Sequence, residues 1–274
     1  MRASSKKPRD EKMPFPYKTA LITGATSGIG YALAERLVAN GVFVIAVGRR
    51  ADRLEQILCK HGSSKVATEV YDVSNIDGIE SWIKEMTTKY PTLDCLILNA
   101  GVQNTFDFTP ALLETAKNEL TLNYLSPLIA TTHILPHFES LSKPTAVILV
   151  TSGLAIVPMP RCANYCASKA ALRSLTWSLR AQLADRGPHT ENIRIIEIVP
   201  PAVKTELHTR QADLVAAGRA GVGMPLEQFI DETWGELEKG EVDDIIIGQA
   251  KYYARGEEER KKAFNGLLAM LRGN

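Results

Sequence analysis

The stretch Thr-Gly-Ala-Thr-Ser-Gly-Ile-Gly, at residues 23–30, decides the fold of this chain. It ends a short apolar run over 18–23 and opens a helical pattern over 28–40. A glycine-rich turn between a strand and a helix exposes backbone N–H groups and the positive end of the helix to a phosphate group. Glycine also allows the tight turn and the close approach that such a site needs. The stretch therefore predicts a binding site for a dinucleotide pyrophosphate.

A second motif, Tyr165-Cys166-Ala167-Ser168-Lys169, lies far along the chain in another helical pattern. Residues four apart share one face of a helix, so the Lys169 ammonium can lie near the Tyr165 phenol oxygen. A nearby positive charge favours the ionised form of a phenol and so lowers its pKa. Together the two motifs predict an enzyme that uses a nicotinamide cofactor.

Short β-branched runs alternate with longer helical patterns along the chain. Strands are expected at 18–23, 42–47, 65–70, 93–98, 146–150 and 193–199, and 245–247 could add a last one. Helices are expected at 28–40, 52–60, 76–89 and 165–184, with a long helical region after Pro110. This alternation predicts an α/β fold of the Rossmann type, a doubly wound parallel sheet of about seven strands with helices on both faces.

The domain organisation follows from length and local composition. A chain of 274 residues can form one large α/β domain or two small ones, and no Pro/Gly/Ser-rich bridge separates its apolar segments. We therefore expect a single catalytic domain over residues 17–274. Residues 1–16 are expected to form a disordered extension, because 1–12 are polar and mostly charged. Residues 206–225 break the alternation with several Gly and Ala and are a candidate lid.

The charge balance excludes some partners. The chain has 32 Lys and Arg against 31 Asp and Glu, and no dense basic tract in its body, which gives nucleic-acid binding little support. Its apolar runs are too short to cross a bilayer. A secretory signal has an apolar stretch after its charged residues, and none follows the charged N-terminal residues here. We expect a cytoplasmic protein that binds neither membrane nor nucleic acid.

The cysteines and histidines do not predict a metal site. Cys162 and Cys166 could share a ligand, but no nearby His completes the set of four that structural zinc needs. His133 and His137 have helical ligand spacing, but Pro136 lies between them and no Glu completes a metalloprotease motif. All four cysteines are expected to be free thiols in a reducing compartment, namely Cys59, Cys95, Cys162 and Cys166.

The end of the second expected strand, Val-Gly-Arg-Arg at 47–50, bears on the choice of cofactor. Sites that prefer NAD(H) usually carry a carboxylate here for the ribose hydroxyls, and this chain has none. Arg49 is placed to bind the 2′-phosphate of NADP(H) with two guanidinium N–H groups. We therefore expect NADPH/NADP+ as the cofactor; the alternative is that both arginines are solvated loop residues.

The order of these motifs resembles the short-chain dehydrogenase/reductase superfamily from about Tyr17 to the C-terminal region. In that family a glycine-rich turn, an Asn-Ala-Gly after the fourth strand, a helix Asn, a Ser after the fifth strand and Tyr-x-x-x-Lys follow in this order. The stretches 152–155, 157–159 and 198–203 look closest to the DltE-like branch. The resemblance implies a set of cofactor-binding residues: Gly24, Thr26, Ser27, Gly28, Ile29, Gly30, Arg49, Asp72, Val73, Asn99, Ala100, Gly101, Tyr165, Lys169, Pro200, Val203 and Thr205.

The same resemblance implies four catalytic residues, Asn123, Ser152, Tyr165 and Lys169. Reduction of a carbonyl needs a hydride at carbon and a proton at oxygen, and Tyr165 can give that proton while Ser152 hydrogen-bonds the same oxygen. Lys169 can also hold the nicotinamide ribose, and Asn123 would place a water that links Lys169 to solvent. Pro201 stands where many relatives have glycine, which implies a stiffer loop at the nicotinamide.

The segments expected to line the substrate site are largely apolar with few charges: 154–159, Gln103 with Asn104, and 206–225. This favours reduction of a ketone or aldehyde group in a small, largely hydrophobic substrate. Two alternatives remain open. One is an imine or iminium reductase or a cyclase in metabolite biosynthesis, and the other is a cofactor-binding scaffold without redox activity.

The helix expected at 165–184 carries apolar residues on more than the one face that covers a sheet. Such a second apolar face needs another partner surface. Members of the family that the chain resembles commonly pair through this helix and the preceding one. We therefore expect a homodimer or homotetramer.

Overall fold

The sheet of the computed structural model, which describes residues 15–273, has seven parallel strands in the order β3-β2-β1-β4-β5-β6-β7. The strands are β1 (Thr19–Thr23), β2 (Phe43–Gly48), β3 (Val66–Val70), β4 (Cys95–Leu98), β5 (Thr145–Val150), β6 (Ile193–Val199) and β7 (Asp244–Ile246). The strand order reverses between β1 and β4, and ligands of open α/β sheets bind at such a point. This topology confirms the predicted doubly wound, Rossmann-type fold.

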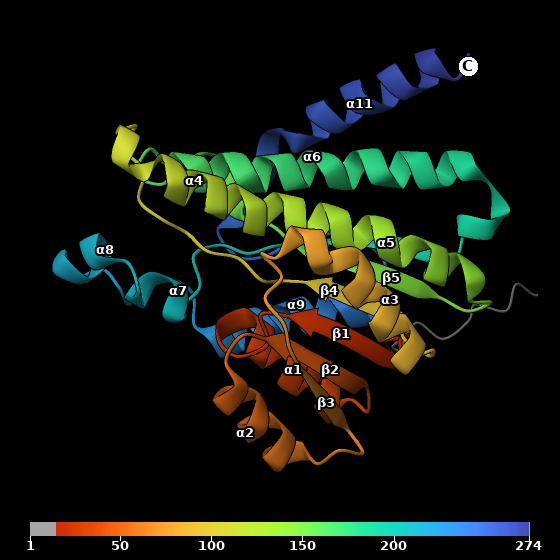
Figure 1. The fold of residues 1–274 in the computed structure, drawn as a ribbon. Helices are drawn as coiled ribbons and strands as arrows, with labels where there is room; N and C mark the ends of the chain where they lie inside the picture. Colours follow the sequence, from red (N-terminus) through yellow and green to blue (C-terminus); the bar gives the residue numbers. More distant parts are fainter. Residues whose placement is uncertain (1–14, 274) are drawn as a thin grey trace, which may run out of the picture.

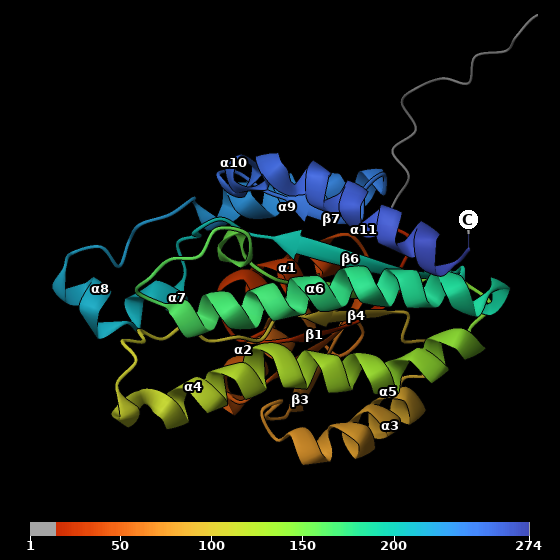
Figure 2. The same ribbon diagram turned by 90° about the horizontal axis from the view of Figure 1, so that it is seen from above.

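Helices cover both faces of the sheet (Figures 1 and 2). The α-helices are α1 (Gly28–Ala39), α2 (Ala51–His61), α3 (Ile79–Lys89), α4 (Leu113–Leu120), α5 (Ser126–Ser140), α6 (Ala163–Arg186), α7 (Glu206–Thr209), α8 (Ala212–Ala216), α9 (Leu226–Lys239), α10 (Ala250–Tyr253) and α11 (Glu257–Leu271). Helices α1, α2 and α9 share one apolar core with the sheet, while α3, α5 and α6 share the other. A π-helical turn, Thr121–Leu125, joins α4 to α5.

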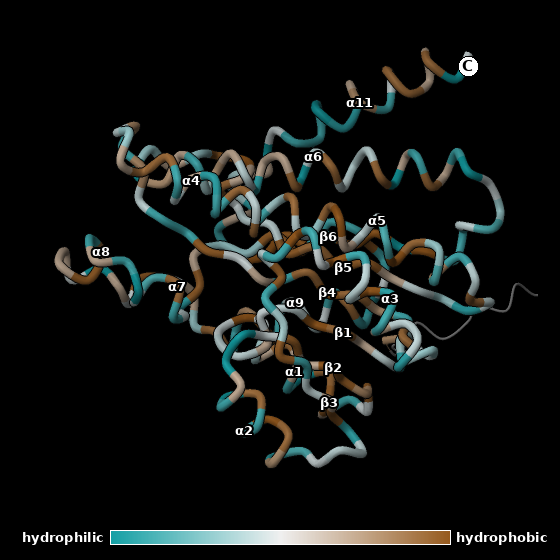
Figure 3. Tube along the Cα trace, in the orientation of Figure 1, coloured by the Kyte–Doolittle hydropathy of each residue, from teal (hydrophilic) through white to brown (hydrophobic). Residues whose placement is uncertain are grey.

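Side chains of each central strand alternate between the two cores. On β1, Ala20 and Ile22 pack into the core with α1 and α9, while Leu21 packs into the core with α3 and α5. Because successive side chains of a strand point to opposite faces, a strand that is buried on both sides must be apolar throughout. The hydrophobic colour of the central strands in Figure 3 follows from this double burial.

Phe15, just before the expected start of the domain, packs against it. Phe15 is buried, and its ring lies 4.9 Å from that of Tyr17 and 5.2 Å from that of Trp234 on α9. Phe15, at the end of the expected extension, is thus part of the apolar core. Residues 1–14 of the expected extension lie outside the described residues.

Helices α9 and α11 were not predicted from the sequence. Helix α9 buries Phe229, Ile230 and Trp234 on one face, a helical spacing that could have revealed it. Helix α11 lies beside α6, where the ring of Phe264 is 5.7 Å from that of Trp177. Across residues 15–273, no helix combines the length and the low polarity needed to cross a bilayer.

The turn between β1 and α1 brings the helix against the sheet. Gly24 and Gly28 have φ of +70° and +55°, values that residues with a Cβ rarely adopt. At Gly30 a Cβ would overlap the Asn99 amide nitrogen and the Gly24 carbonyl oxygen, so no larger residue fits there without movement. These glycines therefore set how closely α1 approaches the ends of β1 and β4.

We predict that Gly30→Ala lowers the free energy of unfolding by about 1–3 kcal/mol, because the added methyl group meets backbone and a hydrogen-bonded amide. Gly235→Ala is the matched control, because it lies inside α9 with nothing within 4 Å of its Cβ position. The free energy of unfolding of the control should rise by about 0.5–1 kcal/mol, because alanine favours the helix more than glycine does. Urea unfolding curves measure both, and equal effects of the two changes would contradict the close approach.

Candidate active site

The ends of β1 and β4 are joined by hydrogen bonds at the point where the strand order reverses. The Thr23 hydroxyl oxygen accepts from the backbone N–H groups of Asn99 and Ala100, both at 3.1 Å. The Asn99 side-chain amide donates to the Thr23 carbonyl oxygen at 3.0 Å. The Asn-Ala-Gly segment is thereby fixed beside the glycine-rich turn, although the two lie about seventy residues apart in sequence.

Asn123 lies in the π-helical turn and is completely buried. Its Oδ1 accepts from the Val102 N–H at 3.0 Å, and its Nδ2 donates to the Val102 carbonyl at 2.9 Å and to the Ser168 hydroxyl at 3.1 Å. A Cβ at Gly101 would lie 3.0 Å from the Asn123 Oδ1 and 3.4 Å from the Lys169 Nζ. Asn123 therefore holds the loop after β4 against the helix that carries Tyr165 and Lys169.

Tyr165 lies near the start of α6 and is 7% exposed. Burial raises the pKa of its phenol above the ordinary value, and a hydrogen bond with the Ser152 side chain opposes part of that rise. Ser152 follows β5, and its hydroxyl oxygen also accepts from the Leu154 N–H at 3.1 Å. The structure thus brings the side chains of Ser152 and Tyr165 together.

Lys169 lies one helical turn after Tyr165 and is 4% exposed. Its Nζ donates to the Val150 carbonyl oxygen at 2.9 Å and lies 5.9 Å from the centre of the Tyr165 ring. Burial lowers the pKa of Lys169 to about 8. Burial is the largest influence on the Tyr165 pKa, so the lowering expected from this ammonium does not bring that pKa below its ordinary value in this structure.

A cavity of about 1010 Å³ runs along the carboxyl ends of the strands. Of the predicted site residues, only Gly30 and Asn123 do not line it, and each lies directly behind residues that do. The others line it together: Gly24, Thr26, Ser27, Gly28, Ile29, Arg49, Asp72, Val73, Asn99, Ala100, Gly101, Ser152, Tyr165, Lys169, Pro200, Val203 and Thr205. A cavity of this size, with glycine backbone at one end, fits a dinucleotide and a small substrate.

The two arginines after β2 point to different partners. Arg49 is 62% exposed in its side chain and pairs with Asp72 at 3.4 Å. Arg50 instead donates to the side-chain oxygens of Thr26, at 2.7 and 2.9 Å, and of Ser27, at 2.7 Å. The sequence singled out Arg49 and missed the contact of Arg50 with the glycine-rich turn, which only the fold can show.

The segment 206–225, which we call the lid segment, carries α7 and α8 beyond the carboxyl ends of the strands (Figures 1 and 2). Its base is closed by two backbone hydrogen bonds, from the Lys204 N–H to the Met224 carbonyl at 2.9 Å and from the Met224 N–H to the Ala202 carbonyl at 2.8 Å. On its inner side Asp213 pairs with Arg161 at 2.8 Å.

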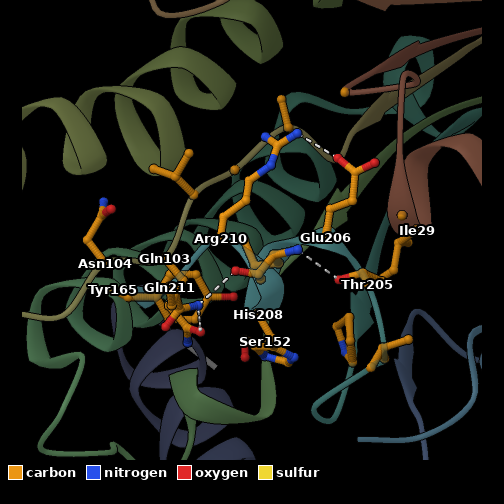
Figure 4. A pocket seen from close by; sticks show the side chains of 18 of the residues that line it. Ile29, Gln103, Asn104, Ser152, Tyr165, Thr205, Glu206, His208, Arg210 and Gln211 are labelled. Carbon is orange, nitrogen blue, oxygen red and sulfur yellow. Dashed lines mark hydrogen bonds and ion pairs between the residues drawn. The ribbon is translucent and has the colours of Figure 1, made fainter. Parts of the chain in front are cut away.

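Two glutamines and a histidine place polar groups in the cavity near Tyr165. Gln211 of the lid segment donates to the Gln103 side-chain oxygen at 2.9 Å, and both lie near Tyr165 in Figure 4. The Gln211 Oε1 and the His208 Nδ1 are buried with no hydrogen-bond partner among the described residues. Burial, with Arg161 nearby, lowers the pKa of His208. These side chains add hydrogen-bonding groups to a lining that also contains Leu154 and Met159.

The thiols near the site form no metal centre. Cys162 and Cys166 are buried beside Tyr165 with their sulfurs 3.9 Å apart, and both are free thiols. Within residues 15–273, no group of three or more His, Cys, Asp and Glu side chains is arranged to hold a metal ion.

Comparisons with known proteins agree with this geometry. A sequence model of the short chain dehydrogenase family matches residues 18–214. The chain is 34% identical over 230 residues to DltE of Bacillus subtilis, a protein described as an uncharacterized oxidoreductase, and the match covers 83% of this chain and 87% of DltE.

Two solved structures share the fold. A short chain dehydrogenase from Burkholderia cenocepacia in complex with NADP has a TM-score of 0.72 and 27% identity, covering 93% of this chain and 99% of that one. A short chain dehydrogenase/reductase from Burkholderia phymatum in complex with NAD has a TM-score of 0.76 and 18% identity, covering 91% and 96%. The expected family and its DltE-like branch are confirmed: this chain belongs to the short-chain dehydrogenase/reductase family of oxidoreductases.

Proposed function

We propose that this protein is an NADPH-dependent oxidoreductase that reduces the carbonyl group of a small ketone or aldehyde, with Tyr165 as the proton donor. The observation that carries the proposal is the position of Ser152, Tyr165 and Lys169 on the same cavity as the glycine-rich turn. A bound dinucleotide would lie between that turn and Tyr165.

The chemistry divides between the cofactor and the chain. The reduced nicotinamide supplies a hydride when it is bound. The phenol of Tyr165 has an ordinary pKa of about 10, which burial raises, so it is protonated at neutral pH and can give its proton to the oxygen of the substrate carbonyl. The Ser152 hydroxyl donates a hydrogen bond to that oxygen as charge develops on it. Lys169 would hold the cofactor ribose, and Asn123 keeps the loop after β4 and α6 at a fixed distance.

The residues that would hold the dinucleotide follow from the cavity. The pyrophosphate would lie against the backbone of the turn at Gly24, Thr26, Ser27, Gly28 and Ile29, with Gly30 behind it. The adenosine would lie beside Arg49, Asp72 and Val73, and the nicotinamide beside Asn99, Ala100, Gly101, Pro200, Val203 and Thr205. The absence of a carboxylate at the end of β2 and the presence of two arginines after it support NADPH over NADH.

NADPH oxidation against a panel of ketones, aldehydes and cyclic imines tests the proposed function. We expect turnover with carbonyl compounds, and a higher kcat/KM with NADPH than with NADH. Turnover of cyclic imines alone would favour an imine reductase instead. Binding of the cofactor without oxidation of it by any compound in the panel would favour a scaffold without redox activity.

Tyr165→Phe should lower kcat by about 100- to 10,000-fold, because it removes the proton donor while preserving the ring. The dissociation constant for NADP+ should change little. Tyr252→Phe is the control, since that tyrosine is 61% exposed and should leave kcat unchanged. Stopped-flow and steady-state rates of NADPH oxidation make the comparison, and near-normal turnover of Tyr165→Phe would remove Tyr165 from its proposed role.

We also propose that the protein forms a homodimer or homotetramer in the cytoplasm. An apolar groove between α5 and α6 supports the assembly, and Leu128, Leu135, Leu175 and Leu179 line it. The cytoplasmic location is supported by the four free thiols, of which Cys59 is exposed.

Light scattering at micromolar concentration should give the mass of a dimer or a tetramer. Leu175→Glu places a charge in the α5–α6 groove and should shift the mass toward the monomer. Val242→Glu, at an exposed position outside that groove, should not change it. A monomeric unmodified protein would contradict the proposed assembly.

A further inference from the structure

The carboxylate of Glu206, at the start of α7, is held by three guanidinium groups. Its Oε2 accepts from the Arg50 Nη1 at 3.0 Å and from the Arg210 Nη2 at 2.6 Å, and its Oε1 accepts from the Arg53 Nη1 at 2.5 Å. Figure 4 shows Arg210 and Glu206 turned toward each other at the edge of the cavity. The hydrogen bond from Arg53 and the other arginines lower the pKa of Glu206 to about 2, so the group is an anion at neutral pH.

Two of these arginines also hold the glycine-rich turn. Arg50 donates to the Thr26 and Ser27 hydroxyl oxygens, and Arg53 donates to the Thr26 carbonyl oxygen at 3.1 Å. Thr26 in turn packs on the end of β2, where a Cβ at Gly48 would lie 2.6 Å from its Cγ2. In this fold the end of the second strand faces the adenosine ribose. The cluster therefore lies where the 2′-hydroxyl of NAD(H) or the 2′-phosphate of NADP(H) would be.

The charges of the cluster do not cancel. Arg50, Arg53 and Arg210 carry three positive charges against the single negative charge of Glu206. Arg49 adds nothing to this excess, because it pairs with Asp72 instead. A phosphate monoester carries about 1.5 to 2 negative charges at pH 7 and has three acceptor oxygens, so it complements the cluster better than one carboxylate does.

We propose that Arg50 and Arg53, with the hydroxyl groups of Thr26 and Ser27, form the site of the 2′-phosphate, and that Glu206 occupies this site until NADP(H) displaces it. This inference rests on the proposed use of NADPH. Glu206 is then a residue that sets cofactor specificity by competition, and its displacement releases α7 and the adjoining lid segment. Binding of the 2′-phosphate is thereby coupled to the freedom of the segment that covers the substrate side of the cavity.

Dissociation constants from isothermal titration test the competition without any turnover. Glu206→Gln should bind NADP+ and adenosine 2′,5′-bisphosphate about three- to tenfold more tightly, because the competing charge is lost from a partly exposed ion pair. The dissociation constants for NAD+ and AMP, which lack the 2′-phosphate, should change less than twofold. Arg50→Ala should weaken the binding of NADP+ by about tenfold or more and the binding of NAD+ by much less.

Asp213→Asn is the matched control. It removes the same charge from the same segment, at a residue that pairs with Arg161 and not with the cluster. It should change the affinities for NADP+ and NAD+ by the same small factor. If Asp213→Asn strengthens NADP+ binding as much as Glu206→Gln does, then any loss of negative charge from the lid segment, or any loosening of it, produces the effect. That result would contradict competition between Glu206 and the 2′-phosphate.

Hydrogen exchange of the amides in 206–216 tests the release of α7. Adenosine 2′,5′-bisphosphate has no nicotinamide to contact the segment, so it should speed exchange there in the unmodified protein, while AMP should not. In Glu206→Gln exchange should already be fast and should not respond to either ligand. Unchanged exchange with adenosine 2′,5′-bisphosphate, or an unchanged ratio of NADP+ to NAD+ affinity in Glu206→Gln, would overturn this inference alone. Failure of the unmodified protein to bind either dinucleotide would overturn the proposed function as well.

Discussion

The close approach of α1 to the ends of β1 and β4 is the constraint on which the rest of the site depends. Gly30 lies where any Cβ would overlap the Asn99 amide nitrogen and the Gly24 carbonyl oxygen. The same Asn99 amide donates to the Thr23 carbonyl, so one side chain fixes the turn to the loop after β4. The turn between β1 and α1 lines the cavity, and its glycines carry no side chains that would cover the backbone at the positive end of α1.

From that point the arrangement extends toward α6. The loop after β4 is held by the buried side chain of Asn123, which also reaches Ser168 between Tyr165 and Lys169. Buried polar groups cost free energy unless they are hydrogen-bonded, so a fully bonded Asn123 favours one spacing of these elements. The reacting groups that we propose are thus positioned by hydrogen bonds that join the loop after β4, the π-helical turn and α6.

Local motifs made much of this structure predictable. The glycine-rich turn, the Asn-Ala-Gly segment and Tyr165 with Lys169 each report a local geometry, and the alternation of strands and helices predicts how the sheet orders them. Contacts between distant residues were not predictable in the same way. Glu206 lies more than 150 residues from Arg50, and nothing in either neighbourhood indicates the ion pair. The polar side chain of Gln211 in the cavity and the raised pKa of Tyr165 likewise depend on burial, which appears only once the chain is folded.

A crystal structure of the protein with bound NADP+ tests the central claim most directly, that one cavity at the reversal of strand order aligns a dinucleotide with Tyr165. The account predicts a pyrophosphate against the backbone of residues 24–30 and a nicotinamide ring beside Ser152 and Tyr165. It also predicts a 2′-phosphate in contact with Arg50 in place of Glu206. A dinucleotide bound elsewhere, or one whose nicotinamide lies away from Tyr165, would contradict the account.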